Sequence, residues 1–167
     1  MRDDLNQLDW REILEKLQSL ATSEPARARL RETSPLASPA AATASFRAIE
    51  EAQSVLAYGE RPFMESLDLY STWYQRLKRE AVLTTFELRD CRRFCIEVVA
   101  LAEVLRPVGG PWVATLKNRL MDATGPLSAI DQIMTPSGEI RNDASERLYA
   151  LHREKQNQTK MLQNVLD

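Results

Sequence analysis

The sequence predicts an all-α fold: an irregular multi-helix bundle of about six to eight helices, with one small β-hairpin or turn near residues 133–141 and a protruding C-terminal helix. Three observations support this prediction. Apolar residues recur at helical spacing along most of the chain, only 5 of its 167 residues are Gly, and its 8 Pro residues stand between the apolar-periodic stretches. This pattern indicates helices with defined stops rather than a disordered chain.

The first predicted helix begins at Asp9, which has the spacing of a capping box with Glu12. The apolar residues that follow share one helical face. We therefore assign Trp10, Leu14 and Leu17 to the structural core.

Three further helices are expected before residue 80. Ser23 is the predicted cap of a short helix with Pro25 in its first turn, where a missing N–H costs little, and Ser38 with Pro39 begins the next helix in the same way. That helix carries a stripe of residues that is expected to be buried, formed by Ala42, Phe46, Ile49, Ala52 and Leu56. Another helix is expected from about residue 67 to residue 79.

The clearest predicted helix begins at a second capping box, Thr84 with Glu87, and continues to Leu105. Its apolar residues follow one another in three- and four-residue steps, as in the seam of a packed helix. The seam consists of Leu88, Cys91, Cys95, Val98, Ala102 and Leu105. All of these except Ala102 are assigned to the structural core.

Glycine and proline mark the next boundaries. Gly109-Gly110-Pro111 breaks the chain and opens a helix that Gly125-Pro126 is expected to close. We therefore expect a helical core domain over residues 1–126 and a turn or hairpin connector over residues 127–144. Within the connector, Thr135-Pro136-Ser137-Gly138 has the composition of a tight turn, and the residues on either side of it can pair as a small hairpin.

Ser145 is the predicted cap of the last helix, over residues 145–167. Its seam positions hold Leu148, Leu151, Lys155, Gln158, Leu162 and Val165. Because the two middle residues are polar, a compact bundle would bury this helix poorly, and no Gly or Pro stops it before Asp167. We expect the truncated start of a lever helix, one strand of a projecting helical arm whose partner helix lies downstream.

No catalytic, cofactor-binding or metal-binding residue is predicted in this chain. The phosphate-binding motif Gly-x-x-x-x-Gly-Lys-Ser/Thr has no match, and the single histidine, His152, has no second ligand at metal-binding spacing. Cys91 and Cys95 share a helical face and could in principle bind metal or respond to oxidation. Their place on the apolar seam favours packing, because a buried Cys behaves as a small hydrophobe.

The formal net charge is -2, whereas a chain that binds nucleic acid mainly through its own surface usually carries a basic excess. Nucleic-acid contact is therefore expected to be local, and Arg153, Lys155 and Lys160 on the projecting helix are the candidates. No apolar run is long enough to cross a bilayer, and the N-terminus lacks the apolar centre of a secretion signal. With only 2 Cys, the expected location is the cytoplasm, without membrane contact.

Two segments, one near each end of the chain, carry motifs whose order and spacing point to one family. The first is Leu8-Asp9-Trp10-Arg11-Glu12-Ile13-Leu14, continued by Ala21-Thr22-Ser23, Leu30 and Pro35. The second is Gly138-Glu139-Ile140-Arg141-Asn142-Asp143-Ala144-Ser145, with Ile133 before it and Leu148 after it. Together they resemble the N-terminal region of the MutS superfamily, in its second, Smr-bearing branch, where the second motif leads into the lever helix.

The resemblance implies the core and the start of the lever of a larger protein. Its downstream domains would be a clamp, an ATPase that binds ATP and Mg, and in many members an Smr nuclease domain. Such proteins are homodimers that engage branched DNA and restrain recombination, while some members act on stalled or collided ribosomes. The resemblance implies no enzymatic activity in this chain itself. It implies that the core and lever couple the state of the ATPase domain to the clamp.

The residues alone leave a second hypothesis open. A free-standing helical adaptor would bind a partner helix through the half-polar seam of its last helix.

Overall fold

The computed structural model describes residues 9–58, 61–62 and 64–166. Over these residues the fold is all-α, which confirms the predicted class. It consists of eight α-helices and one short 3-10 helix, η1. Their bounds are α2 Trp10–Leu20, α3 Glu24–Arg31, α4 Pro39–Ala57, η1 Glu65–Asp68, α5 Tyr70–Lys78, α6 Thr85–Leu105, α7 Pro111–Arg119, α8 Thr124–Ile133 and α9 Glu146–Leu166.

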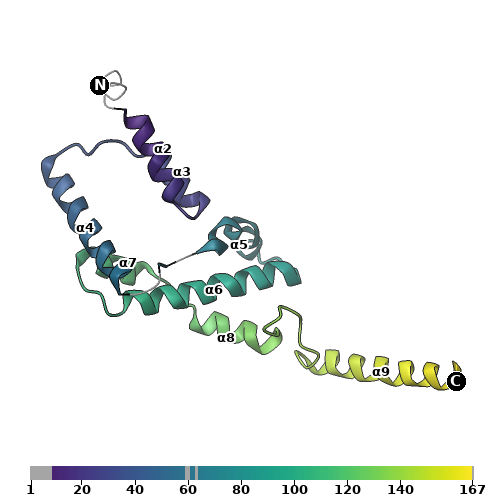
Figure 1. The fold of residues 1–167 in the computed structure, drawn as a ribbon. Helices are drawn as coiled ribbons and strands as arrows, with labels where there is room; N and C mark the ends of the chain where they lie inside the picture. The colour runs from purple at the N-terminus through teal and green to yellow at the C-terminus, as the bar shows by residue number, and fades with distance from the viewer. Residues whose placement is uncertain (1–8, 59–60, 63, 167) are drawn as a thin grey trace.

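Helix α6 is the centre of a helical body (Figure 1). η1, α5, α7 and α8 all pack against it, and α4 packs on α7. α2 and α3 form a hairpin that reaches the rest of the body through η1. α9 runs away from the body, so the described chain is a bundle with one protruding helix (Figure 1).

The start of α6 is held by the predicted capping box. Thr84 Oγ1 accepts a hydrogen bond from Glu87 N (3.3 Å), and the Glu87 carboxylate accepts one from Thr84 N (2.7 Å). The bond from the Thr84 backbone holds the pKa of Glu87 below its ordinary value. Arg76 of α5 lies 3.3 Å from the same carboxylate, so the cap also ties α5 to α6.

Serine caps are confirmed at three other helices, and one predicted cap is wrong. The hydroxyls of Ser23, Ser38 and Ser145 each accept a hydrogen bond from a backbone N–H in the first turn of α3, α4 and α9. Asp9 precedes α2 but is in the left-handed region, with φ of 51°, and its side chain makes no capping bond. A capping side chain needs an extended backbone at that position, so the expected capping box of Asp9 with Glu12 does not form.

Two small clusters of buried side chains hold the body together. The cluster that joins α6 to α4 and α7 consists of Val55, Leu105, Val108 and Val113. The cluster that joins α6 to the start of α8 consists of Cys95, Val98 and Ala123. Of the predicted core residues on α6, Cys95, Val98 and Leu105 are therefore buried, whereas Leu88 and Cys91 are half-buried.

Aromatic rings join α5 to α6. The ring centroids of Tyr70 and Trp73 each lie 5.4 Å from that of Phe94. A polar contact joins η1 to α6 beside these rings. The Glu97 carboxylate of α6 accepts hydrogen bonds from the backbone N–H (3.1 Å) and the hydroxyl of buried Ser66 in η1. α6 thus anchors η1 by a polar contact and α5 by an apolar one.

The first helix is less buried than its pattern predicts. Leu14 is buried and Trp10 is half-buried, with its Nε1 donating to the carbonyl of Thr33 (3.4 Å). Leu17, however, is 41% exposed, so its assignment to the core is wrong. The reason is that α2 has one main neighbour, α3, and a single neighbour covers only part of an amphipathic face.

The stripe that was expected to be buried on α4 is also largely uncovered. Phe46 is 65% exposed, and Ile49 and Leu56 are exposed as well. α4 packs on α7, and the residue it buries there is Val55, one position before Leu56. The helix was therefore predicted correctly, whereas its contact face was not.

A carboxylate on α4 caps the start of α7. Glu51 Oε2 accepts a hydrogen bond from Val113 N (2.9 Å), which brings negative charge to a helix N-terminus, where the free N–H groups and the helix dipole favour it. The carboxylate fills the space beside Gly110 that a Cβ would occupy, and the φ of Gly110 is +126°. The predicted break at Gly109-Gly110-Pro111 thus also makes room for Glu51.

Few contacts between described residues hold the α2–α3 hairpin to the body. Glu24 N donates to Asp68 Oδ1 of η1 (2.9 Å), and Arg61 donates to the carbonyl of Leu20 (2.9 Å). The segment that joins α3 to α4, residues 32–38, is exposed throughout.

The domain boundary expected at residue 126 is not a break in the chain's secondary structure. Gly125 and Pro126 lie in the first turn of α8. Backbone N–H groups there have no partner within the helix, so the missing N–H of Pro126 costs no hydrogen bond. Asp122 accepts hydrogen bonds from both N and Oγ1 of Thr124 (2.9 and 2.6 Å) and so supports the start of this helix. The connector expected over residues 127–144 is therefore helical as far as Ile133.

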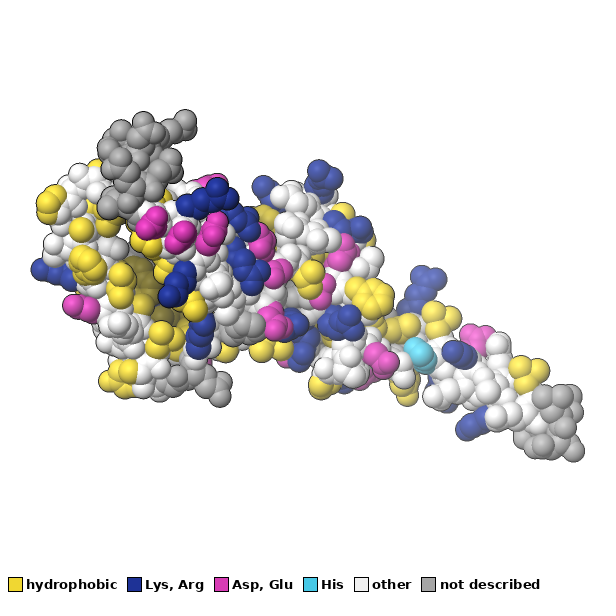
Figure 2. Space-filling view, turned by 45° about the horizontal axis from the view of Figure 1, so that its top comes forward, with side chains coloured by type: hydrophobic (Ala, Val, Ile, Leu, Met, Phe, Trp, Pro, Cys, Tyr) yellow, Lys and Arg dark blue, Asp and Glu magenta, His cyan; other side chains and the backbone are white. Residues whose placement is uncertain are grey.

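The chain leaves much more surface uncovered than a compact domain does. Its accessible surface is 13103 Å² for a mass of 19.0 kDa, whereas a compact monomer of that mass has about 8,400 Å². Apolar side chains contribute to the difference, as the yellow areas over the body and α9 show (Figure 2). The excess, roughly 4,700 Å², is larger than a single standard protein–protein interface buries on one partner.

Val98→Asp will unfold the centre of the body, whereas Ile96→Asp on the same helix will not. Val98 is 2% exposed, so an Asp there would bury an unpartnered charge and lower the free energy of unfolding by more than about 3 kcal/mol. Ile96 is 40% exposed, and its replacement should cost less than about 1 kcal/mol. Urea unfolding followed by circular dichroism measures both; an equal loss in the two variants would contradict the assignment of this core.

Gly110→Ala will destabilise the α4–α7 contact, and Gly109→Ala is its matched control. At Gly110 the positive φ and the Glu51 carboxylate both oppose a Cβ, while a Cβ at Gly109 would meet nothing within 4 Å. We expect a loss of about 1–3 kcal/mol for the first variant and little change for the second, measured by urea unfolding. If the two variants unfold alike, Glu51 does not need the space beside Gly110.

Candidate functional site

The surface of α9 is the candidate functional site, because it carries the predicted phosphate-contact residues and stands apart from the body (Figure 1). No other element of the described chain packs along it. Leu148 at its start is half-buried. The large apolar side chains beyond it are exposed; they are Tyr149, Leu151, Met161 and Leu162.

A tight turn sets the direction in which α9 leaves α8. Thr135 N donates to the carbonyl of Glu139 (2.8 Å), and Gly138 N donates back to the carbonyl of Thr135 (2.9 Å). Gly138 has φ of +85°, a conformation that a residue without a side chain adopts at little cost. The predicted turn at residues 135–138 is confirmed.

The residues on either side of the turn pair through one antiparallel bridge. The bridge joins Met134 to Ile140, and Arg141 N donates to the carbonyl of Ile133 (2.9 Å). The guanidinium of Arg141 also donates two hydrogen bonds to Asp143, both of 2.9 Å. These bonds hold the pKa of Asp143 below its ordinary value. The expected hairpin is thus reduced to a bridge, braced by an Arg–Asp pair.

Two arginines on α6 tie this turn to the body. Arg92 lies 2.6 Å from the Asp131 carboxylate of α8. The stem of Arg89 crosses Gly138 so closely that a Cβ there would lie 2.5 Å from Arg89 Cδ. Both contacts join α6 to the segment that precedes α9.

The three predicted phosphate-contact residues are exposed, but they do not form one patch. Arg153 and Lys160 are seven residues apart and therefore lie on one side of the helix, about 10 Å apart along its axis. Lys155 faces away from Arg153 and lies near His152 and Thr159. Helical spacing thus places Arg153 on the side of Lys160 and away from Lys155, whereas Lys155 and Lys160 line one shallow hollow.

α9 carries an excess of positive charge, although the whole chain has a formal net charge of -2. The charged residues of the helix are Arg147, Arg153, Lys155 and Lys160 against Glu146 and Glu154. Over the body, Lys and Arg are interspersed with Asp and Glu (Figure 2), and several of them form ion pairs. α9 can therefore attract a polyanion locally, although α3, α5 and α7 each carry the same excess of two positive charges.

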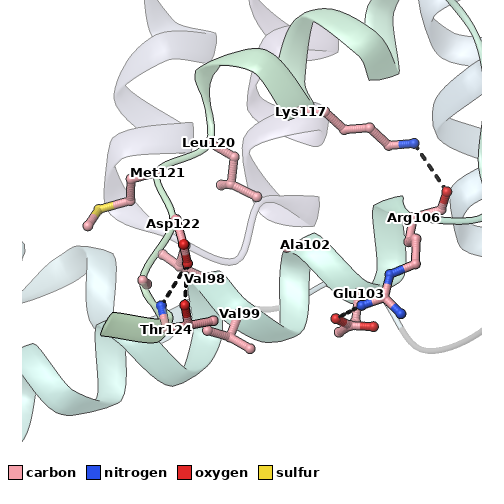
Figure 3. A pocket seen from close by; sticks show the side chains of 11 residues that line it. Val98, Val99, Ala102, Glu103, Arg106, Lys117, Leu120, Met121, Asp122 and Thr124 are labelled. Carbon is pink, nitrogen blue, oxygen red and sulfur yellow. Dashed lines mark hydrogen bonds and ion pairs between the residues drawn. The ribbon is translucent and has the colours of Figure 1, made fainter. Parts of the chain in front are cut away.

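A second surface feature is an apolar groove of about 360 Å³ beside α6 (Figure 3). Its walls come from α6, the end of α7 and the α7–α8 connection. The apolar lining consists of Val98, Val99, Ala102, Leu120, Met121 and Ala123. A groove of this kind can receive an apolar side chain.

The charged groups at the rim of this groove are already paired (Figure 3). Lys117 Nζ donates to the carbonyls of Arg106 (3.2 Å) and Val108 (2.8 Å), and Arg106 also pairs with Glu103. The hydrogen bonds from Thr124 hold the pKa of Asp122 below its ordinary value. Because these polar groups are engaged with one another, the groove offers a ligand mainly apolar contact.

The cysteine pair on α6 has the environment of packing residues. Burial raises the pKa of Cys91 to about 11, with Cys95 beside it adding to the shift, and burial also raises the pKa of Cys95. A thiol held protonated is a poor nucleophile and a poor metal ligand. This supports the packing role over the metal-binding and redox alternatives.

Among the described residues, no group of three or more His, Cys, Asp or Glu side chains is placed to hold a metal ion. No helix in the same part of the chain is long and apolar enough to cross a membrane.

Sequence reasoning missed the side chains that hold the base of α9. Arg89 and Arg92 belong to a run of basic residues whose spacing marks only a polar helix face. Their partners, Gly138 and Asp131, lie 39 or more residues away, and no periodicity signals such a contact. Gly138 is the one residue of this contact that the sequence singles out. Its place in the turn explains its positive φ, but it does not indicate that Arg89 lies beside it.

Comparison with known proteins assigns no family to this chain. No protein-family model matches the sequence, and no curated protein matches it. The MutS-type resemblance therefore rests on the motifs of residues 8–35 and 133–148.

The thiols of Cys91 and Cys95 will react slowly with iodoacetamide in the folded protein. Since the thiolate is the nucleophile, a pKa of about 11 against an ordinary 9 lowers the reactive fraction of Cys91 at pH 8 about a hundredfold. Labelling should accelerate as the pH rises toward 11, and it should be fast at pH 8 in denaturant. Mass spectrometry of timed samples measures the rate; fast labelling of folded protein at pH 8 would contradict the packing role.

Proposed function

We propose that this chain is the core and lever segment of a MutS-type ATPase that acts on branched DNA and restrains recombination. The observation that carries the proposal is the way α9 leaves the body. It is a 21-residue helix that projects without a neighbour among the described residues and begins at a braced turn. Such a helix can carry a displacement over about 30 Å.

The proposed mechanism is mechanical. ATP and Mg would be bound by the ATPase domain that follows in such proteins, and no residue of this chain takes part in that chemistry. A movement of α6 would reach α9 through the Arg92–Asp131 ion pair and through the contact of Arg89 with Gly138. Two attachment points on one short segment oppose both translation and rotation of the helix base.

Contact with DNA is assigned to the outer side of α9. Arg153 and Lys160 share that side and are exposed. Side chains about 10 Å apart along a helix axis can reach different phosphates of one nucleic-acid backbone. Phosphate contacts of this kind supply affinity without reading sequence, which suits a protein that recognises the shape of a branched junction.

Replacement of both residues, Arg153→Gln with Lys160→Gln, is expected to weaken binding to a four-way DNA junction. The plot of log affinity against log salt concentration should become less steep by about two, because each phosphate contact contributes about one unit of slope. Fluorescence anisotropy with labelled junction, forked and linear duplex DNA, between about 50 and 300 mM salt, measures both quantities.

The matched control is Lys16→Gln with Arg47→Gln, which removes the same charge from exposed positions on α2 and α4. It should leave the salt slope unchanged. Equal slopes in the two double variants, or no preference of the unmodified chain for junction over linear DNA, would count against the proposal. Binding to ribosomes under the same conditions, without binding to the junction, would also count against it.

A further inference from the structure

Two helices of the described chain, α2 and α4, each leave an apolar face uncovered. The face of α2 consists of Ile13, Leu17 and Leu20, and the face of α4 includes Phe46, Ile49 and Leu56. All six residues are between 41% and 65% exposed. From these two faces we infer that the α2–α3 hairpin is a lid, which closes by laying the apolar face of α2 along that of α4. The inference does not depend on the proposed function.

Among the described residues, the hairpin is fastened mainly at one end. Near the loop between α2 and α3, Arg61 donates to the carbonyl of Leu20 (2.9 Å). At the start of α3, Glu24 N donates to Asp68 Oδ1 (2.9 Å). The other end continues into residues 32–38, an exposed segment that leads to α4 (Figure 1) and can extend over about 24 Å. The two hydrogen bonds therefore form a pivot, about which the free end of the hairpin can swing toward α4.

The pivot stands at the rim of an apolar groove that the closed lid would cover. The groove has a volume of about 200 Å³ and lies between α4, α6 and α7. Its apolar walls include Leu56, Leu101 and Trp112. Arg61, which holds the carbonyl of Leu20, also lines it. The end of α2 is therefore already next to the groove, and closure only has to bring the rest of the helix onto α4.

The apolar faces of α2 and α4 have the same spacing. Ile13 and Leu20 are seven residues apart on α2, and Ile49 and Leu56 are seven residues apart on α4, which is about 10 Å along each helix. With Leu20 beside Leu56 at the groove, a parallel arrangement places Ile13 beside Ile49. Such packing would remove apolar surface from water on both helices, and it explains why each helix carries an apolar face that the described contacts leave uncovered.

The hairpin also has an advantage over any separate partner for the same face. A short flexible connection holds one binding element near the other at a concentration of about a millimolar, and residues 32–38 are a short exposed connection. A separate apolar partner therefore has to displace the lid before it reaches the groove. Closure of the lid thus regulates access to the groove between α4, α6 and α7.

Cross-linking within one chain tests the closure. In the variant Ile13→Cys with Ile49→Cys, mild oxidation should join the two thiols, because the closed lid brings these positions together. Ile13→Cys with Arg47→Cys is the matched control and should give little product, since Arg47 is exposed on another side of α4. A non-reducing gel measures the yield, and mass spectrometry separates these links from any to Cys91 or Cys95. Equal yields in the two variants, or links only between separate chains, would overturn the inference.

Thiol labelling tests the closure without a cross-link. In the variant Ile49→Cys, the closed lid covers the new thiol, so iodoacetamide should label it slowly. Adding Leu20→Lys, which places a charge where the closed lid would bury it, should accelerate labelling at least about threefold. Adding Ser19→Lys, on another side of α2, should not. Equal labelling rates in the three chains would contradict the closure, and equal melting temperatures by circular dichroism show that the chains are folded.

Discussion

Burial of one face of α6 is the constraint on which the rest of the body depends. Cys95 and Val98 meet the start of α8, while Leu105 meets α4 and α7 ten residues further along. α6 is the common wall of the two clusters, and Leu120 at the end of α7 packs against both of them. The capping box of α6 sets which residues enter each cluster, since the helix begins at a defined position.

Polar contacts then decide how the surrounding helices are oriented. Glu51 meets the start of α7, Glu97 holds η1, and Arg92 meets α8. Each of these charged groups has its partner on a different helix. Apolar packing alone would fix the angle between two helices less closely than these directional contacts do. The cores are small, so directional bonds carry more of the specificity here than in a large domain.

Local signals in the sequence predicted local structure well. The capping residues Thr84, Ser23, Ser38 and Ser145, and the turn at residues 135–138, act within a few residues of their partners, and all are observed. Burial was predicted less well. Leu17 and Phe46 lie on apolar faces that periodicity assigns to a core, yet no neighbour in the described chain covers them fully. Periodicity identifies the face of a helix, whereas burial depends on which other helix arrives there. The same limit applies to the site, where α9 and the turn were predicted but the contact of Arg89 with Gly138 was not.

The attachment of the α2–α3 hairpin has a consequence for how the molecule opens. Among the described residues, its contacts with the body lie mainly at η1 and Arg61, and the segment that joins it to α4, residues 32–38, is exposed. Local opening follows the elements with few buried contacts. We therefore expect the hairpin to detach and re-dock as a separate unit while both α6 clusters stay closed. An opening of this kind would uncover η1 and leave the base of α9 undisturbed.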